Sequence, residues 1–146
     1  FRFPFLQLAE VTLAVNISGM TLCFLAVAAL SEGNSNTPSG DRMLMLLLRE
    51  QESAVNDVRS LFFGCLDQAW AELTTNGLVA EPTLYQISII SHTLVVQCRA
   101  TVDAIYPLCS TSSKAPGGNL NRVWRNIHTS LMHALFGGRM ERSEVT

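Results

Sequence analysis

The segment of residues 11–30, VTLAVNISGMTLCFLAVAAL, has no charged side chain over twenty positions. A helix this long and this apolar either crosses a membrane or is buried on all sides within a protein. Four Thr, Asn and Ser side chains dilute the run and no Lys or Arg flanks it, which disfavours a membrane span. We therefore expect a helix over residues 4–30 that is buried in a larger protein or in an oligomer, with no membrane partner.

The composition predicts a single domain that is covered by other parts of a larger protein. A chain of 146 residues is long enough for one hydrophobic core, but its charged residues make up 15%, against roughly 25% in ordinary globular domains. The chain begins with Phe1 and enters a helical pattern almost at once, so we expect residues 1–146 to be one domain of a longer protein. The net charge of -2 provides no basic field for phosphates, which argues against nucleic-acid binding.

The four cysteines are far apart in the sequence and show no CxxC spacing. Each lies in an apolar stretch, which predicts buried thiols in a reducing compartment and hence a cytoplasmic protein. No metal site is predicted from them. They are Cys23, Cys65, Cys98 and Cys109.

Three further helices are predicted over residues 41–75, 82–106 and 120–136. Asp41 suits an N-cap, Pro107 stops a helix, and Gly residues follow the second and fourth segments. In the second segment the apolar positions recur every three or four residues with one gap, at Gln51. Long helices joined by polar loops, with no alternating strand pattern, predict an all-α, four-helix up-down bundle that oligomerises through bundle faces.

The last predicted helix divides into two faces. At 100° per residue, four polar positions fall within about 40° of Arg122 and form one stripe. These are Arg122, Asn126, Thr129 and His133. The apolar positions face the bundle, and His128 lies at their edge, so the two histidines of this helix point in different directions and cannot hold a metal together.

Each polar residue has two interpretations. His133 is a candidate general base or hydrogen-bond donor, because imidazole titrates near neutral pH, or it is a histidine on a solvated stripe. Arg122 and Arg125 can bind a phosphate or carboxylate, or form ordinary surface salt bridges. His128 and His92 are interpreted as packing residues of an interface or of the core.

The segments AIYPLCS and LNRVWRNIHTSLMHALF, with the order of the helices, make the chain similar to one known family. It resembles the C-terminal helical domain of the acyl-CoA dehydrogenase fold. The nearest branch is that of flavin-dependent two-component monooxygenases, whose last helices commonly read LQRxWRDxHTAxxH. This resemblance implies a flavin, FAD or FMN, held between this bundle, an N-terminal helical domain and a central β-barrel. It also implies a homodimer or homotetramer, and a bundle that is inactive alone.

The resemblance also assigns roles residue by residue. His133 matches the histidine near the reactive flavin ring and substrate, and Arg125 matches the motif's arginine. Thr129 matches the hydroxyl residue after the motif's first histidine, while Asn126 departs from the usual Asp. With Arg122, these residues form the set of candidate flavin-binding side chains, and His133 is the candidate catalytic residue.

A second feature separates the branches of the family. Dehydrogenase members place a catalytic glutamate slightly downstream of the arginine, whereas this sequence has no Asp or Glu between Asp103 and Glu141. The sequence therefore favours the histidine-bearing monooxygenase branch. A different hypothesis also stands: a non-catalytic helical module that uses the bundle only for interaction and assembly.

Overall fold

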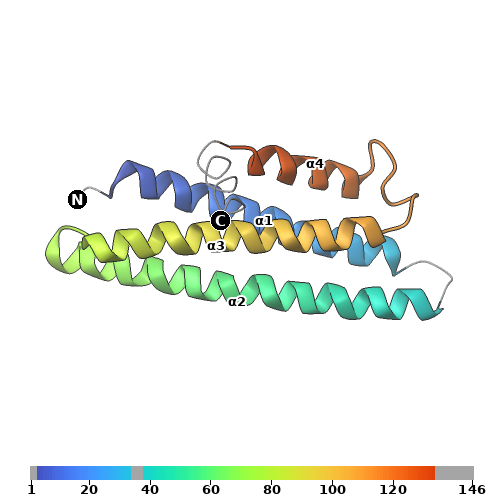
Figure 1. Cartoon of the computed structure of the whole chain (residues 1–146), viewed down its shortest axis with the longest axis horizontal. Helices are drawn as coiled ribbons and strands as arrows, with labels where there is room; N and C mark the ends of the chain where they lie inside the picture. The colour runs from blue at the N-terminus through green and yellow to red at the C-terminus, as the bar shows by residue number, and fades with distance from the viewer. Residues whose placement is uncertain (1–2, 34–37, 134–146) are drawn as a thin grey trace, which may run out of the picture.

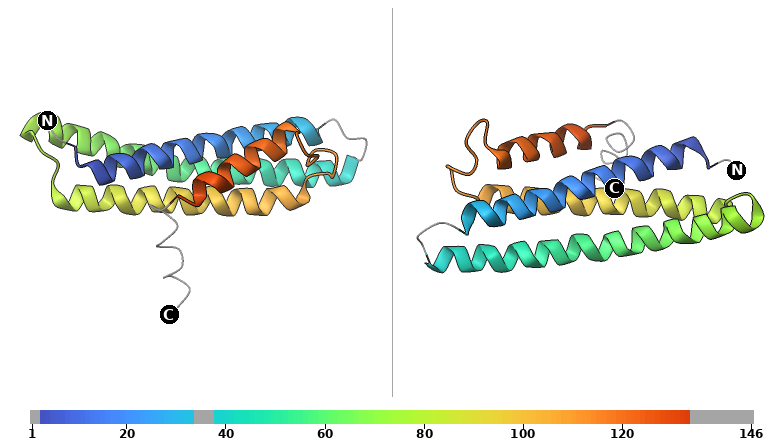
Figure 2. Two further views of the ribbon diagram at one scale, coloured as in Figure 1. Left: turned by 90° about the horizontal axis from the view of Figure 1, so that it is seen from above. Right: turned by 180° about the vertical axis from the view of Figure 1, so that it is seen from behind.

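The computed structural model describes residues 3–33 and 38–133, and within them it contains four α-helices and no strand (Figure 1). Successive helices run in opposite directions, as the views of Figures 1 and 2 agree. The predicted all-α up-down bundle is confirmed for this part of the chain. The elements are α1 (Phe5–Glu32), α2 (Pro38–Asn76), α3 (Glu81–Ile105), the short 3-10 helix η1 (Tyr106–Leu108) and α4 (Asn119–Leu131).

The helix boundaries agree with the sequence where the stop signals are strong. Gly77 follows α2 with a φ of 76°, a conformation that glycine adopts without strain, and its N–H donates to the carbonyl of Leu73. Pro107 lies within η1, where α3 has already ended. The prediction of Asp41 as an N-cap is wrong, because α2 begins at Pro38, and proline suits a first helical turn.

The predicted end of the last helix is also wrong in the described part. The α-helix ends at Leu131, and Met132 and His133 leave it through a turn and a bend. The N–H of His133 donates to the carbonyl of Ser130, an i to i−3 bond that tightens the last turn. The rest of the predicted helix, residues 134–136, lies outside the described residues.

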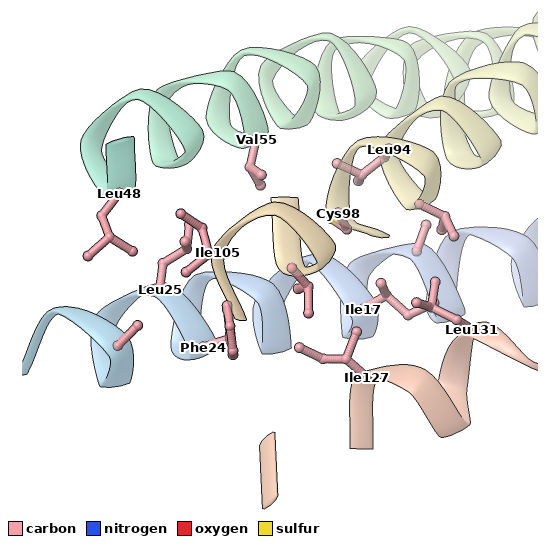
Figure 3. Packing of buried hydrophobic residues seen from close by; sticks show 14 of the residues in the cluster. Ile17, Phe24, Leu25, Leu48, Val55, Leu94, Cys98, Ile105, Ile127 and Leu131 are labelled. Carbon is pink, nitrogen blue, oxygen red and sulfur yellow. The ribbon is translucent and has the colours of Figure 1, made fainter. Parts of the chain in front are cut away.

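The core is formed by inward-facing side chains of all four helices, which meet along the axis of the bundle (Figure 3). Helix α1 packs against each of the other three, α2 packs mainly on α3, and α4 packs mainly on α1. The fully buried side chains confirm most of the predicted apolar seams. The largest are Phe24, Phe62, Ile17, Ile87, Leu94, Ile105, Leu120 and Ile127.

The gap in the apolar pattern of α2 corresponds to a polar contact between helices. Gln51 accepts a hydrogen bond through its Oε1 from the Oγ1 of Thr101 on α3, at 2.8 Å. Thr101 is fully buried, so its hydroxyl needs this partner. The hydrogen bond therefore explains why a glutamine stands where the pattern expects an apolar residue.

The expectation that α1 is buried on all sides refers to a larger protein or an oligomer and stays a prediction for the single chain. One face of α1 is exposed, including Phe5 at 83% and Leu30 at 74% of their surface. Among the described helices, α1 alone is long and apolar enough to cross a membrane by length and composition, and the core helix of a bundle passes the same test. Here its inner face packs against three helices.

The four cysteines have different environments. Cys98 and Cys109 are buried as predicted, but Cys65 is half-buried and Cys23 is exposed on α1, so the prediction is wrong for these two. Burial raises the pKa of the Cys98 thiol to about 11. Burial, with the nearby Glu32 carboxylate, raises the pKa of Cys109 to about 11. Both buried thiols therefore stay protonated near neutral pH.

Glu72, near the end of α2, caps the start of α3. Its carboxylate accepts hydrogen bonds from the Ala80 N–H at 2.9 Å and from the Thr83 hydroxyl at 2.6 Å. These bonds, with one from Gln68, hold the pKa of Glu72 below its ordinary value. The negative charge also lies at the positive end of the α3 dipole.

We expect a thiol reagent to distinguish the cysteines of the native chain at neutral pH. Cys23 should react at the rate of a free thiol, whereas Cys98 and Cys109 should react only after unfolding, since they are buried and protonated. Mass spectrometry of peptides after timed labelling measures these rates. Labelling of Cys98 as fast as Cys23 would contradict the packing described.

We expect Glu72→Gln to lower the melting temperature at neutral pH. A carboxylate whose folded pKa is lowered stabilises the fold above its ordinary pKa of 4.5, and this stabilisation is lost as the pH falls through the lowered value. The difference between the two proteins should therefore shrink in acid. The matched control is Glu81→Gln; a melting-temperature difference for Glu72→Gln that does not depend on pH would rule out the charged cap.

Candidate functional site

Three residues of the predicted polar stripe, Arg122, Asn126 and Thr129, are on α4, and the fourth, His133, lies just beyond the end of the helix. Arg122, Asn126, Thr129 and His133 are all exposed, and so is Arg125 beside them. The opposite face of α4 is held against the bundle by three buried side chains, Leu120, Ile127 and Leu131. Burial of these residues fixes the rotation of the helix about its own axis and turns the stripe outward.

Part of the hydrogen-bonding capacity of the stripe is used within α4. The Nη2 of Arg122 donates to the Oδ1 of Asn119 at 3.1 Å, and the hydroxyl of Thr129 donates to the carbonyl of Arg125 at 2.9 Å. The Thr129 hydroxyl can therefore still accept a hydrogen bond but has no proton left to donate. The arginine and asparagine side chains retain further donors.

His133 lies at the end of the stripe, beside an open groove of about 370 Å³. The groove is a feature of the N-terminal half of α1, and most of its walls are apolar. Its lining residues are Phe5, Leu8, Ala9, Thr12, Leu13, Asn16 and His133. The structure thus puts the candidate catalytic histidine next to an apolar depression, whereas Arg122 lies about 16 Å farther along, at the other end of the helix.

His128 packs against the bundle, as predicted. Its ring lies tilted against that of Trp124 with centroids 4.3 Å apart, and Trp124 in turn stacks on Tyr106 at 4.6 Å. One ring nitrogen, Nδ1, is 3.0 Å from the carbonyl of Trp124, and the other, Nε2, is 3.2 Å from the Oδ1 of Asp103 on α3. His128 is therefore a docking residue for α4 and does not join His133.

No group of three or more His, Cys, Asp or Glu side chains within the described ranges could hold a metal ion. The two histidines of the α4 segment point to different surroundings, one to Asp103 and the other to the α1 groove.

A polar cluster between α1 and α3 was missed by the sequence reasoning. Glu10, only 2% exposed, accepts a 2.5 Å hydrogen bond from the hydroxyl of Ser88, and its Oε1 lies 3.5 Å from the Nε2 of His92. The Gln7 amide donates to Ser88 at 3.4 Å. The signal was Glu10 itself, the lone charged side chain between Phe5 and Leu30, placed on the buried face of the helix.

The comparisons with known proteins bear on this arrangement. Residues 23–137 match the family described as acyl-CoA dehydrogenase, C-terminal domain. The chain belongs to this family. The match includes all of α2, α3 and α4 together with the C-terminal part of α1, and it therefore covers the whole polar stripe. No curated protein and no solved structure is significantly similar to the chain.

The family match bears on the exposed face of α4, because proteins of this family generally use a flavin. Acyl-CoA dehydrogenases are generally flavin-dependent, and their domains generally oligomerise. The residues present suit one side of such a site, since two guanidinium groups and an amide project from one exposed face of α4 and the imidazole of His133 follows just after the helix.

Proposed function

We propose that this acyl-CoA dehydrogenase C-terminal domain contributes side chains to the flavin site of an oxidoreductase and helps to form its oligomer. The observation that carries the proposal is the outward-facing stripe of α4 in a chain of this family. Three apolar residues suffice to pack α4 against α1. The opposite face of α4 nevertheless carries cationic and amide hydrogen-bond donors. Such donors suit an anionic or oxygen-rich ligand.

Arg125 and Arg122 are the residues suited to the phosphate of FAD or FMN, since a planar guanidinium can bind a phosphate through two hydrogen bonds. Asn126 can donate to and accept from a flavin ring or ribityl chain, and Thr129 can accept. A bound flavin supplies the electron transfer that these side chains cannot perform. The chain's own part is to hold and orient it.

His133 is proposed as the catalytic residue, either as a base or as a hydrogen-bond partner of flavin and substrate. Its support is position: it lies at the edge of the apolar groove and at the end of the stripe. The sequence has no Asp or Glu between Asp103 and Glu141 to replace it. For this reason we propose the monooxygenase branch rather than the dehydrogenase branch.

The exposed apolar residues of α1 support self-association into a homodimer or homotetramer. Phe5, Leu8 and Leu30 are each at least half exposed in the single chain, and burial of such side chains favours association. Free cysteines at all four positions are consistent with a cytoplasmic protein. The remaining domains of the proposed enzyme would supply the barrel side of the flavin site.

A non-catalytic assembly module is the second candidate. It is favoured by the internal hydrogen bonds of the stripe, such as Arg122 to Asn119, and by the exposed apolar face of α1. The coding sequence upstream of Phe1 distinguishes the oxidoreductase domain from the assembly module. A region encoding a β-barrel supports the oxidoreductase, and a region encoding none supports the module.

We expect the isolated chain of 146 residues to be colourless and inactive when purified. The stripe presents one wall of a flavin site, so retention of the cofactor needs the other domains. Visible absorbance of the purified chain, with and without added FMN or FAD, tests this. Flavin that copurifies in equal molar amount would contradict the expectation.

In the full-length protein we expect His133→Ala to reduce turnover by about 10²- to 10⁴-fold, the range typical of losing a general acid or base, without releasing flavin. Because His133 is exposed, the melting temperature of the His133→Ala protein should change little. The matched variant is His128→Ala, which should lower the melting temperature through lost contacts with Trp124 and Asp103. Unchanged turnover in His133→Ala would remove this residue from the mechanism.

A further inference from the structure

His128 makes a polar contact between α4 and α3, two helices that have only slight contact with each other. Its imidazole lies between two oxygen atoms. Nδ1 is 3.0 Å from the carbonyl oxygen of Trp124, one turn earlier on α4, and Nε2 is 3.2 Å from the Oδ1 of Asp103 on α3. A carbonyl oxygen and an ionised carboxylate accept hydrogen bonds and donate none. The ring therefore faces an acceptor at each of its nitrogens.

Only one charge state of the ring satisfies both acceptors. A neutral imidazole carries one N–H and one lone pair, so one of its nitrogens would direct a lone pair at an oxygen atom. The imidazolium carries an N–H at each nitrogen and can donate to both oxygens. It therefore makes one more hydrogen bond than the neutral ring. The hydrogen bond between imidazolium and carboxylate is also charge-assisted, which strengthens it further.

Three features around His128 favour the imidazolium electrostatically. The Asp103 carboxylate has the opposite charge. The ring of Trp124 lies against the imidazole with centroids 4.3 Å apart, and an indole ring attracts a cation. His128 also stands in the last turn of α4, at the negative end of the helix dipole. The same side chain is thus drawn toward the charged form by an ion, a ring and a helix end.

Two arginines oppose the positive charge on His128. The Nε of Arg99 on α3 lies 3.6 Å from the other oxygen of the Asp103 carboxylate, and Arg125 stands three positions before His128 on α4. Both arginines are exposed, so water and salt screen their repulsion. Tyr106 of η1 stacks on Trp124, and a phenol is uncharged near neutral pH. From α1, on which α4 mainly packs, residues 11–30 contribute no charged side chain.

We propose that α4 is held against α3 by a proton-dependent latch, in which the imidazolium of His128 donates to Trp124 and to Asp103. Raising the pH removes the proton and one of the two hydrogen bonds, so docking is firmest in mild acid and weakens as the pH rises through neutrality. Arg125 and Thr129 lie on the exposed side of the same turns of α4, so the latch also controls how firmly they are positioned. The proposal does not depend on flavin binding.

The test measures how firmly α4 is docked at two pH values. Hydrogen exchange of the α4 amides is followed by mass spectrometry and expressed as protection factors, which remove the intrinsic pH dependence of exchange and report local opening. The two values are about pH 5.5 and about pH 8.5, between which an imidazole loses its charge while a carboxylate stays ionised. The proteins are the native chain, His128→Gln and Asp103→Asn. The matched control is Asp67→Asn, which removes an exposed carboxylate from α2.

In the native chain and in Asp67→Asn we expect the protection of α4 to fall about three- to tenfold from the lower to the higher pH, the effect of losing one hydrogen bond. His128→Gln should show nearly equal protection at both values, because glutamine stays neutral. Asp103→Asn should do so too, since its amide can turn to donate to a neutral ring. The amides of α2 serve as the reference for general loosening of the fold.

Two results would overturn the proposal. One is a native chain in which the protection of α4 does not fall relative to that of α2. The other is a fall in His128→Gln or Asp103→Asn that equals the native one. If His128→Gln does not fold, Asp103→Asn decides the matter, because its side chain is 49% exposed and its replacement leaves the core intact.

Discussion

The whole arrangement depends on the burial of the inner face of α1. This helix packs against the other three, whereas α4 has only slight contact with α3 and depends on α1 for its position. The contact is made by side chains such as Ile17 and Ile127, which are fully buried, with Leu131 beside them (Figure 3). Full burial of each such side chain contributes about 1.5–3 kcal/mol. Rotating α4 would lose several of these contributions together, so its polar face is held outward by apolar packing on the other side.

The helices were predictable because their signals are local. Periodicity and the stops at Gly77 and Pro107 located α1, α2 and α3 to within three residues at each end. The signals failed at the start of α2 and at the end of α4. A proline displaced Asp41 as the first residue of α2, and a tight turn at Met132 ended α4 before any glycine. The sequence carried a signal for the first of these, since proline suits a first helical turn, but none for the second.

The site was predictable in part for the same reason. A helix of 3.6 residues per turn places Arg122, Asn126 and Thr129 on one face whatever the tertiary structure. The contacts that depend on folding were not predictable. His128 meets Asp103 across 25 positions, and Glu10 meets Ser88 across 78. Periodicity predicted which way α4 faces, and the family match gives that face its proposed role.

The buried carboxylate of Glu10 has a consequence for how α1 and α3 find their alignment. Apolar faces built from alanine, isoleucine and leucine can pack in several registers of similar energy, each displaced by one helical turn. A carboxylate that is 2% exposed and hydrogen-bonded to Ser88 distinguishes among them, since a slip of one turn would strand it among apolar groups. Leaving one charged partner buried and unpaired costs about 3–5 kcal/mol. Glu10, the lone charged side chain between Phe5 and Leu30, thus gives the apolar interface of α1 and α3 a unique alignment, much as one polar residue sets the register of a coiled coil.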